Sequence, residues 1–154
     1  MSYNPILRKA TMADATDIAN VYLASRKEFI SFAPLIHTDH SIHQWVLEDL
    51  LIDEQVIVAE EGGVIIGMMS LTSDEGMGRV RQLYISPSAV GKGVGTLMIK
   101  MAKLILGPPI RLYTFQENMG ARRFYERHGF QFKEFNDGSG NEENCPAVLY
   151  EWKK

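Results

Sequence analysis

A glycine-rich segment that joins an apolar strand pattern to a helical pattern constrains this chain most strongly. Leu83, Tyr84 and Ile85 have the apolar, aromatic and β-branched character of a buried strand. Pro87 cannot continue a central strand, and from Thr96 onward apolar residues recur at helical spacing. A glycine loop that opens a helix predicts an anion site, because the first N–H groups of the helix lack intrahelical partners and carry positive potential.

The spacing within this loop separates the kinds of phosphate-binding loop. Its residues are, in order, Val90, Gly91, Lys92, Gly93, Val94, Gly95 and Thr96. A P-loop requires Ser or Thr after its Gly-Lys pair, whereas Gly93 stands there, and Ser86 occupies the position of its first glycine. The dinucleotide fingerprint requires a third glycine where Thr96 stands. Both of these nucleotide-binding patterns therefore fail.

A third pattern, Gln/Arg-x-x-Gly-x-Gly/Ala, fits residues 90–95 except that Val90 replaces the Gln or Arg. In this respect the loop resembles the pyrophosphate loop of the GNAT superfamily of N-acetyltransferases, which hold acetyl-CoA. A second stretch is similar to the family's N-x-x-A-x-x-F-Y-x-x-x-G-F signature, at Asn118, Ala121, Phe124, Tyr125, Gly129 and Phe130. Two signatures in the family's order are far more specific than either one alone.

The order of predicted elements agrees with this resemblance along essentially the whole chain. Strands are expected at 4–10, 55–60, 64–72, 80–86, 110–115, 130–135 and 147–152, and helices at 11–30, 41–51, 96–106 and 118–127. The order β-α-α-β-β-β-α-β-α-β-β predicts an α+β fold. We expect a GNAT-like mixed, mostly antiparallel sheet of about seven strands, with helices on both faces.

Length and composition bound the class of protein. At 154 residues we expect one N-acetyltransferase domain spanning 1–154. A net charge of −3 argues against a general nucleic-acid or anionic-membrane binder. The single Cys145 excludes an intrachain disulfide and, with no leader pattern at the start and no bilayer-length apolar run, predicts a cytoplasmic protein.

The resemblance implies transfer of an acetyl group from acetyl-CoA to a primary amine of a small molecule or peptide, by direct attack through a tetrahedral intermediate. It implies cofactor binding by Leu83, Tyr84, Ile85, Val90, Gly91, Lys92, Gly93, Val94, Gly95, Thr96, Asn118 and Arg122. It also implies that the strand 83–85 splays from its neighbour to admit the pantetheine arm. A backbone N–H at Leu83 or Tyr84 would then stabilise the oxyanion.

Tyr125 is the expected general acid. On a helix, Asn118, Arg122 and Tyr125 share one narrow polar stripe, beside the more core-facing Ala121 and Phe124. A phenol with a pKa of about 10 can protonate the departing thiolate, and the resemblance assigns this role to Tyr125. The alternative is an amphipathic tyrosine at the edge of the core.

The general base is less constrained. The strand leading to the glycine loop carries no carboxylate, so Asp74 and Glu75 in the expected loop 73–78 are the nearest choices, with Glu75 preferred. A solvated acidic loop is an alternative, as is a reaction that needs no dedicated base because a desolvated amine loses its proton more easily.

The acceptor side is expected to come from the first two helices and the loop before the last strand. Glu142 and Glu143 in that loop could attract a cationic amine or simply be solvated. The histidines His37, His40 and His43 lack the Cys or clustered carboxylates of a metal site, so no metal is expected. A non-catalytic acyl-CoA-binding regulatory module and a nucleotide-dependent enzyme remain alternatives, and the sequence allows a monomer or a homodimer.

Overall fold

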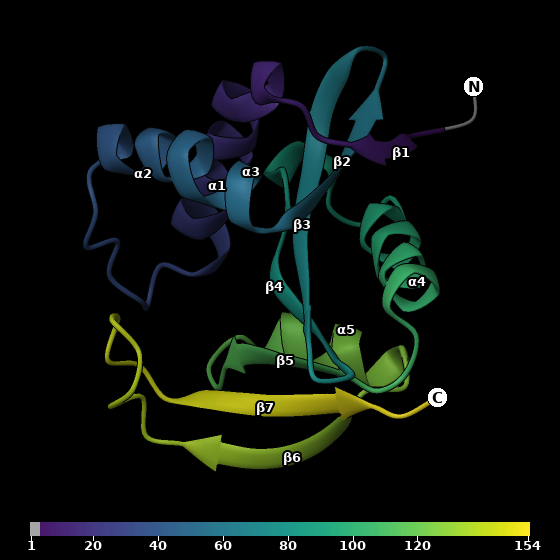
Figure 1. Cartoon of the computed structure of the whole chain (residues 1–154). Coiled ribbons are helices and arrows are strands. Elements are labelled where there is room, and N and C mark those ends of the chain that lie inside the picture. The colour runs from purple at the N-terminus through teal and green to yellow at the C-terminus, as the bar shows by residue number, and fades with distance from the viewer. Residues whose placement is uncertain (1–3) are drawn as a thin grey trace.

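The computed structural model describes residues 4–154 and shows one seven-stranded sheet in the order β1-β2-β3-β4-β5-β7-β6 (Figure 1). Residues 1–3, part of the start used in the leader argument, lie outside the described residues. The strands are β1 (Ile6–Lys9), β2 (Gln55–Glu61), β3 (Val64–Asp74), β4 (Met77–Ile85), β5 (Ile110–Phe115), β6 (Gln131–Asn136) and β7 (Ala147–Trp152). All neighbouring strands are antiparallel except β4 and β5, which confirms the expected mixed sheet.

The helical elements follow the predicted order and cover both faces of the sheet (Figure 1). They are η1 (Met12–Asp14), α1 (Ala15–Phe29), α2 (Asp39–Trp45), η2 (Val46–Leu50), α3 (Leu51–Asp53), η3 (Pro87–Ala89), α4 (Val94–Leu106) and α5 (Met119–Arg127). The predicted second helix is thus divided by the π-helical turn η2. It begins after Thr38 rather than Ser41, because the Thr38 hydroxyl accepts a hydrogen bond from the Ser41 N–H at 3.1 Å.

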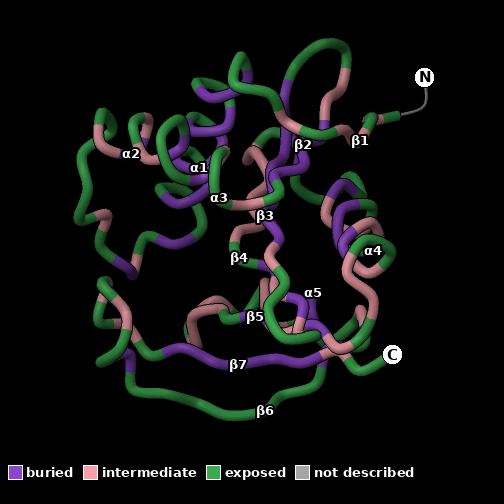
Figure 2. The backbone as a smooth tube through the Cα atoms, viewed as in Figure 1, coloured by how far each residue is buried: buried purple, intermediate pink, exposed green. Residues whose placement is uncertain are grey.

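Two apolar clusters lie on the two faces of the sheet. One joins α1, α2 and η2 to the sheet through residues such as Ile18, Val46 and Met68. The other joins α4 to it through Met98 and Ile99, among others. Because β3 is covered from both sides, its residues 65–71 are all buried, whereas the edge strand β6 is exposed throughout (Figure 2).

The strands β4 and β5 diverge in the middle of the sheet. They pair only at Gly78 with Ile110 and at Arg79 with Arg111, near the start of each strand. On its other side β4 stays paired with β3 as far as Ile85, with a bulge around Arg81. The β5-facing edge of β4 is therefore free of a neighbouring strand beyond residue 79, which agrees with the splay implied by the resemblance.

The loop expected over 73–78 is wrong, because β3 and β4 form a continuous hairpin there. Asp74 pairs with Met77, so only Glu75 and Gly76 make the turn. Both adopt positive φ angles, 50° and 79°. The polar residues that suggested a loop are exposed strand residues at the hairpin tip.

Candidate active site

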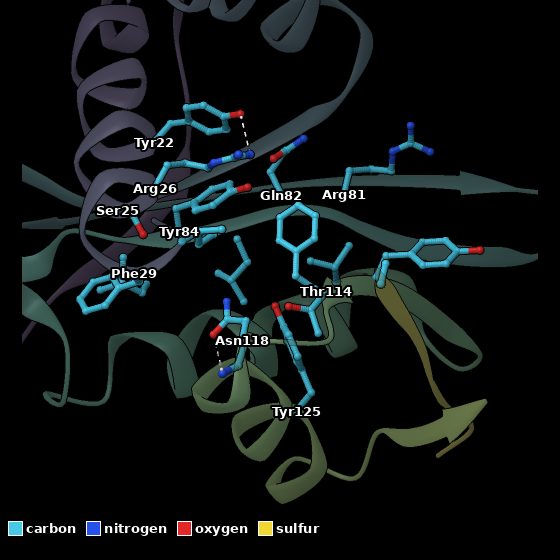
Figure 3. A pocket seen from close by; sticks show the side chains of 18 of the residues that line it. Tyr22, Ser25, Arg26, Phe29, Arg81, Gln82, Tyr84, Thr114, Asn118 and Tyr125 are labelled. Carbon is cyan, nitrogen blue, oxygen red and sulfur yellow. Dashed lines mark hydrogen bonds between the residues drawn. The ribbon is translucent and has the colours of Figure 1, made fainter. Parts of the chain in front are cut away.

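A cleft of about 1520 Å³ opens where β4 and β5 diverge. Its walls come from α1, α2, β4, the glycine loop, β5, α5 and the loop between β6 and β7. Figure 3 shows Tyr22, Arg26 and Tyr84 on one side of this space and Asn118 and Tyr125 on the other. Every residue predicted to bind the cofactor lines the cleft, apart from Lys92 and Arg122.

The glycine loop places the start of α4 at one end of the cleft. Gly91 and Gly93 have φ angles of 82° and 85°, which side chains with a Cβ rarely adopt, and space is open on the Cβ side of both. Gly93 caps α4, so the N–H groups that follow it have no intrahelical partner. Gly95 has another reason to lack a side chain, since a Cβ there would lie 3.1 Å from the Phe124 ring. This end of the cleft therefore fits a diphosphate anion.

The free edge of β4 presents backbone groups to the cleft at alternate residues. The Ser86 N–H donates to the Ile66 carbonyl at 2.8 Å, which fixes the hydrogen-bonding register with β3. In an antiparallel pair of strands, residues whose backbone groups hydrogen-bond to the neighbouring strand alternate with residues whose backbone groups point away from it. The backbone groups of Tyr84 and Gln82 therefore form hydrogen bonds with β3, whereas the N–H and carbonyl groups of Leu83 and Ile85 point toward the cleft. Of the two residues expected to donate to the oxyanion, the register favours Leu83.

Tyr125 is the buried residue of α5, and its phenol points into the cleft (Figure 3). Its ring packs against Phe124, Phe130 and Tyr150 at centroid distances of 5.2, 5.7 and 6.4 Å. Burial, helped by Tyr84, raises the pKa of this phenol above its ordinary value, so it keeps its proton at neutral pH. The geometry gives a fixed, protonated hydroxyl inside the cleft.

Asn118 lines the cleft as the N-cap of α5. Its Oδ1 accepts a hydrogen bond from the Ala121 N–H at 3.2 Å, which fixes the side chain at the end of the helix. Arg122 lies on the same predicted stripe but points to β7. Its guanidinium donates to the Tyr150 hydroxyl and to the Gln116 carbonyl, each at 3.2 Å. The structure therefore does not place Arg122 among the residues that line the cleft.

The preferred base is far from these groups. Glu75 is exposed at the β3–β4 turn and does not line the cleft. Six residue steps along β4 separate Leu83 from Met77, the first residue after this turn, roughly 20 Å at the rise of a strand. The structure does not bring Glu75 or the neighbouring Asp74 together with Tyr125.

The acceptor end of the cleft contains a buried arginine that the motifs did not reveal. Arg26 is 4% exposed, and its guanidinium donates to Glu143 at 3.1 Å and to the Tyr22 hydroxyl at 3.4 Å. Glu142 pairs with His37 at 3.1 Å. Glu143 is therefore not simply solvated, since it ties the β6–β7 loop to α1, whereas the side chains of His37 and Glu142 are 47% and 57% exposed.

Further lining residues could not have been grouped from the sequence, because they lie in separate segments. They include Tyr22, Trp45, Glu54, Gln82 and Thr114. The one available signal was Arg26, a charged residue four positions after Tyr22 on the apolar stripe of a helix.

The described part of the chain has no group of three or more His, Cys, Asp or Glu side chains arranged to hold a metal ion. Within residues 4–154, no helix has the length and apolar character needed to cross a bilayer.

Comparisons with known proteins bear on the family and the fold. The family model of the acetyltransferase (GNAT) domain matches residues 52–132, which include β4, the glycine loop and α5. No curated protein sequence gives a significant match.

Solved structures show the same fold. The GCN5-related N-acetyltransferase from Rhodopseudomonas palustris is 21% identical, with a TM-score of 0.81 over 100% of this chain and 99% of that one. The PaiA N-acetyltransferase from Thermoplasma acidophilum, solved with coenzyme A, is 20% identical, with a TM-score of 0.77 over 98% and 99%. The ribosomal-protein-alanine N-acetyltransferase from Brucella melitensis is 17% identical, with a TM-score of 0.74 over 97% and 99%. With more than half of its residues matched by the family model, the chain belongs to the GNAT family of acetyltransferases.

Proposed function

We propose that this N-acetyltransferase transfers the acetyl group of acetyl-CoA to a primary amine of a small molecule or peptide, with Tyr125 as general acid. One observation carries the proposal. A single cleft connects the start of α4, the free edge of β4 and the phenol of Tyr125. A donor that carries a diphosphate at one end and a thioester at the other needs these three features in this order.

The donor side is supported by the fit of the residues to the ligand. Gly91 and Gly93 leave room for a diphosphate against the N–H groups that open α4. The backbone of Leu83 and Ile85 has no strand neighbour on the cleft side and can pair with an extended, amide-containing arm. When bound, acetyl-CoA supplies an activated acyl group, and coenzyme A is the ligand of the similar PaiA N-acetyltransferase.

The Leu83 N–H and the Tyr125 phenol then stabilise the negative charges that develop during the reaction. The N–H of Leu83 stabilises negative charge on the carbonyl oxygen under attack, an effect of about 3 kcal/mol for one donor. Tyr125 donates its phenolic proton to the sulfur as the C–S bond breaks. Its raised pKa keeps that proton available at neutral pH.

The experiment compares coenzyme A, acetyl-CoA and ATP in a thermal-shift assay, followed by thiol release against a panel of amines. A ligand present at about 100 times its dissociation constant stabilises the folded protein by about 2.7 kcal/mol. We expect a rise in melting temperature with the two coenzyme A species and none with ATP, and thiol release that depends on an amine. Stabilisation without release by any amine would leave only a binding module, and no stabilisation would contradict the proposal.

A further inference from the structure

Three polar side chains, those of Glu54, Ser70 and Gln82, form a line across the α1-covered face of the sheet toward the cleft. Val56, Ser70 and Gln82 lie opposite one another on β2, β3 and β4. The next row along the strands, Val58, Met68 and Tyr84, packs in the cluster beneath α1, so the first row faces the same side.

Glu54 continues this line. Its backbone is extended, with φ −126° and ψ 157°, and it lies two residues before Val56. It therefore projects to the same face, as a diagonal neighbour of Ser70 at about 7–8 Å. Both Glu54 and Gln82 line the cleft.

Two atoms of this line are buried without a hydrogen-bond partner among residues 4–154. They are Glu54 Oε1 and Ser70 Oγ. A buried polar atom left unpaired costs about 1–3 kcal/mol, and more when it belongs to a charged group. Two such atoms on diagonal neighbours can share a water, which needs two or more polar partners.

The other carboxylates of the cleft are engaged or peripheral. Glu143 pairs with buried Arg26, and Glu142 pairs with His37. Asp137 accepts a hydrogen bond from the Ser139 N–H, and Asp49 is exposed on η2. Among the carboxylates that line the cleft, Glu54 alone has a buried oxygen without a protein partner.

We propose that Glu54 is the proton acceptor for the amine substrate, through a water held by the Ser70 hydroxyl. This inference rests on the proposed function. Two strand spacings, about 10 Å, separate Glu54 from β4, so the proton travels through water rather than by direct contact.

The ammonium gives one proton to the Glu54 carboxylate, which becomes a carboxylic acid and later releases the proton to solvent. The neutral amine then forms the new C–N bond, which gives a tetrahedral intermediate, and the C–S bond breaks as this intermediate collapses. Tyr125 gives its proton to the sulfur and regains one from the acylated nitrogen.

Other charged or titratable groups lie on the elements that pack over this face. They include Arg79, Arg81 and Tyr84 on β4, Tyr22 and Arg26 on α1, His43 on α2 and Asp49 on η2. Burial raises the pKa of Tyr22 and of Tyr84, so both phenols stay neutral near pH 7. The unaltered protein and a Glu54 variant share all of these groups, so a difference between their pH profiles reports on Glu54.

The test measures kcat/KM against pH for Glu54→Gln with two small acceptors, ethylamine and trifluoroethylamine. An alkylammonium has a pKa of about 10 and is almost fully protonated near pH 7, whereas fluorine makes its analogue mostly neutral there. We expect Glu54→Gln to lower kcat/KM for ethylamine by about 100-fold near neutral pH, and this difference should disappear as the pH approaches about 10. The variant should lower kcat/KM for the fluorinated amine only a little. Glu54→Asp should retain part of the activity with ethylamine.

Asp53→Asn is the matched control, since it removes the same charge next to Glu54 at an exposed residue that does not line the cleft, and it should leave kcat/KM unchanged. An equal loss with both amines at every pH would mean a structural role and overturn the inference, as would no loss at all. Failure of the proposed function is visible separately, as absence of amine-dependent thiol release by the unaltered protein.

Discussion

At the scale of single residues, Tyr125 and Tyr150 offer a matched comparison. Both are buried in the same aromatic group, but only Tyr125 lines the cleft. The Tyr150 hydroxyl donates to Glu126 at 2.6 Å and accepts from Arg122, so its role is structural.

We predict that Tyr125→Phe lowers kcat by about 100-fold, because a general acid contributes at least that much, while coenzyme A binding changes little. Tyr150→Phe should lower the melting temperature and leave kcat near normal. Since the pKa of Tyr125 is raised, its proton is retained as the pH rises, so loss of that proton should not lower activity below about pH 10. Steady-state kinetics and calorimetry of coenzyme A binding check this. Equal kcat values in the two variants would remove Tyr125 from the mechanism.

Single residues also mark the limit of what the sequence could predict. Tyr125, Asn118 and the glycine loop lie in two contiguous signatures, so the linear sequence was sufficient to identify them. Arg26 and Glu143 are 117 positions apart, and only the fold brings them together. Glu54 lies diagonal to Ser70 because of the β2–β3 register, which no local pattern specifies.

At the scale of elements, periodicity and turn residues predicted the strands and helices well, since each buries a face with its own repeat. The hairpin tip at Glu75 was missed because exposed strand residues are as polar as a loop. The extent of β4–β5 pairing was also beyond the sequence, because two parallel strands joined through a helix carry no turn that fixes their register.

The next prediction concerns the glycine loop and compares Gly93→Ala with Gly63→Ala as its control. Both glycines have a positive φ, 85° and 81°, and open space on the Cβ side. Each substitution should therefore lower the free energy of unfolding by a similar amount, roughly 1–2 kcal/mol, because of backbone strain. Gly93 opens α4 at the cleft, whereas Gly63 lies in the β2–β3 turn.

We expect Gly93→Ala to weaken coenzyme A binding at least tenfold and Gly63→Ala to leave it unchanged. Unfolding experiments test whether the two variants lose the same stability, and titration calorimetry measures the binding. A similar affinity in both variants would mean that the loop only begins the helix.

At the scale of the whole molecule, the two halves of the sheet meet through few backbone pairs. Only two residue pairs join β4 to β5. Arg26 bridges the gap from α1 to Glu143 in the β6–β7 loop, with side chains 4% and 14% exposed, and its guanidinium stacks on Phe115 of β5 at 5.9 Å. Because this pair spans the cleft, we propose that it couples the halves into one folding unit over 1–154.

We therefore predict that Arg26→Met or Glu143→Leu alone costs about 3–5 kcal/mol of stability, because each leaves a buried charge without its partner. The double variant should lose less than the sum, since no charge remains, and the unaltered protein should unfold in a single transition. Lys27→Met, which breaks the exposed Lys27–Asp39 pair on the same helix, should cost no more than about 1 kcal/mol. The single variants should also raise the KM for the amine more than that for acetyl-CoA, because the pair lies at the acceptor end. Denaturant unfolding and a double-mutant cycle measure the coupling. Strictly additive losses would show that the pair contributes no coupling, and two separate transitions of the unaltered protein would show that the halves fold independently.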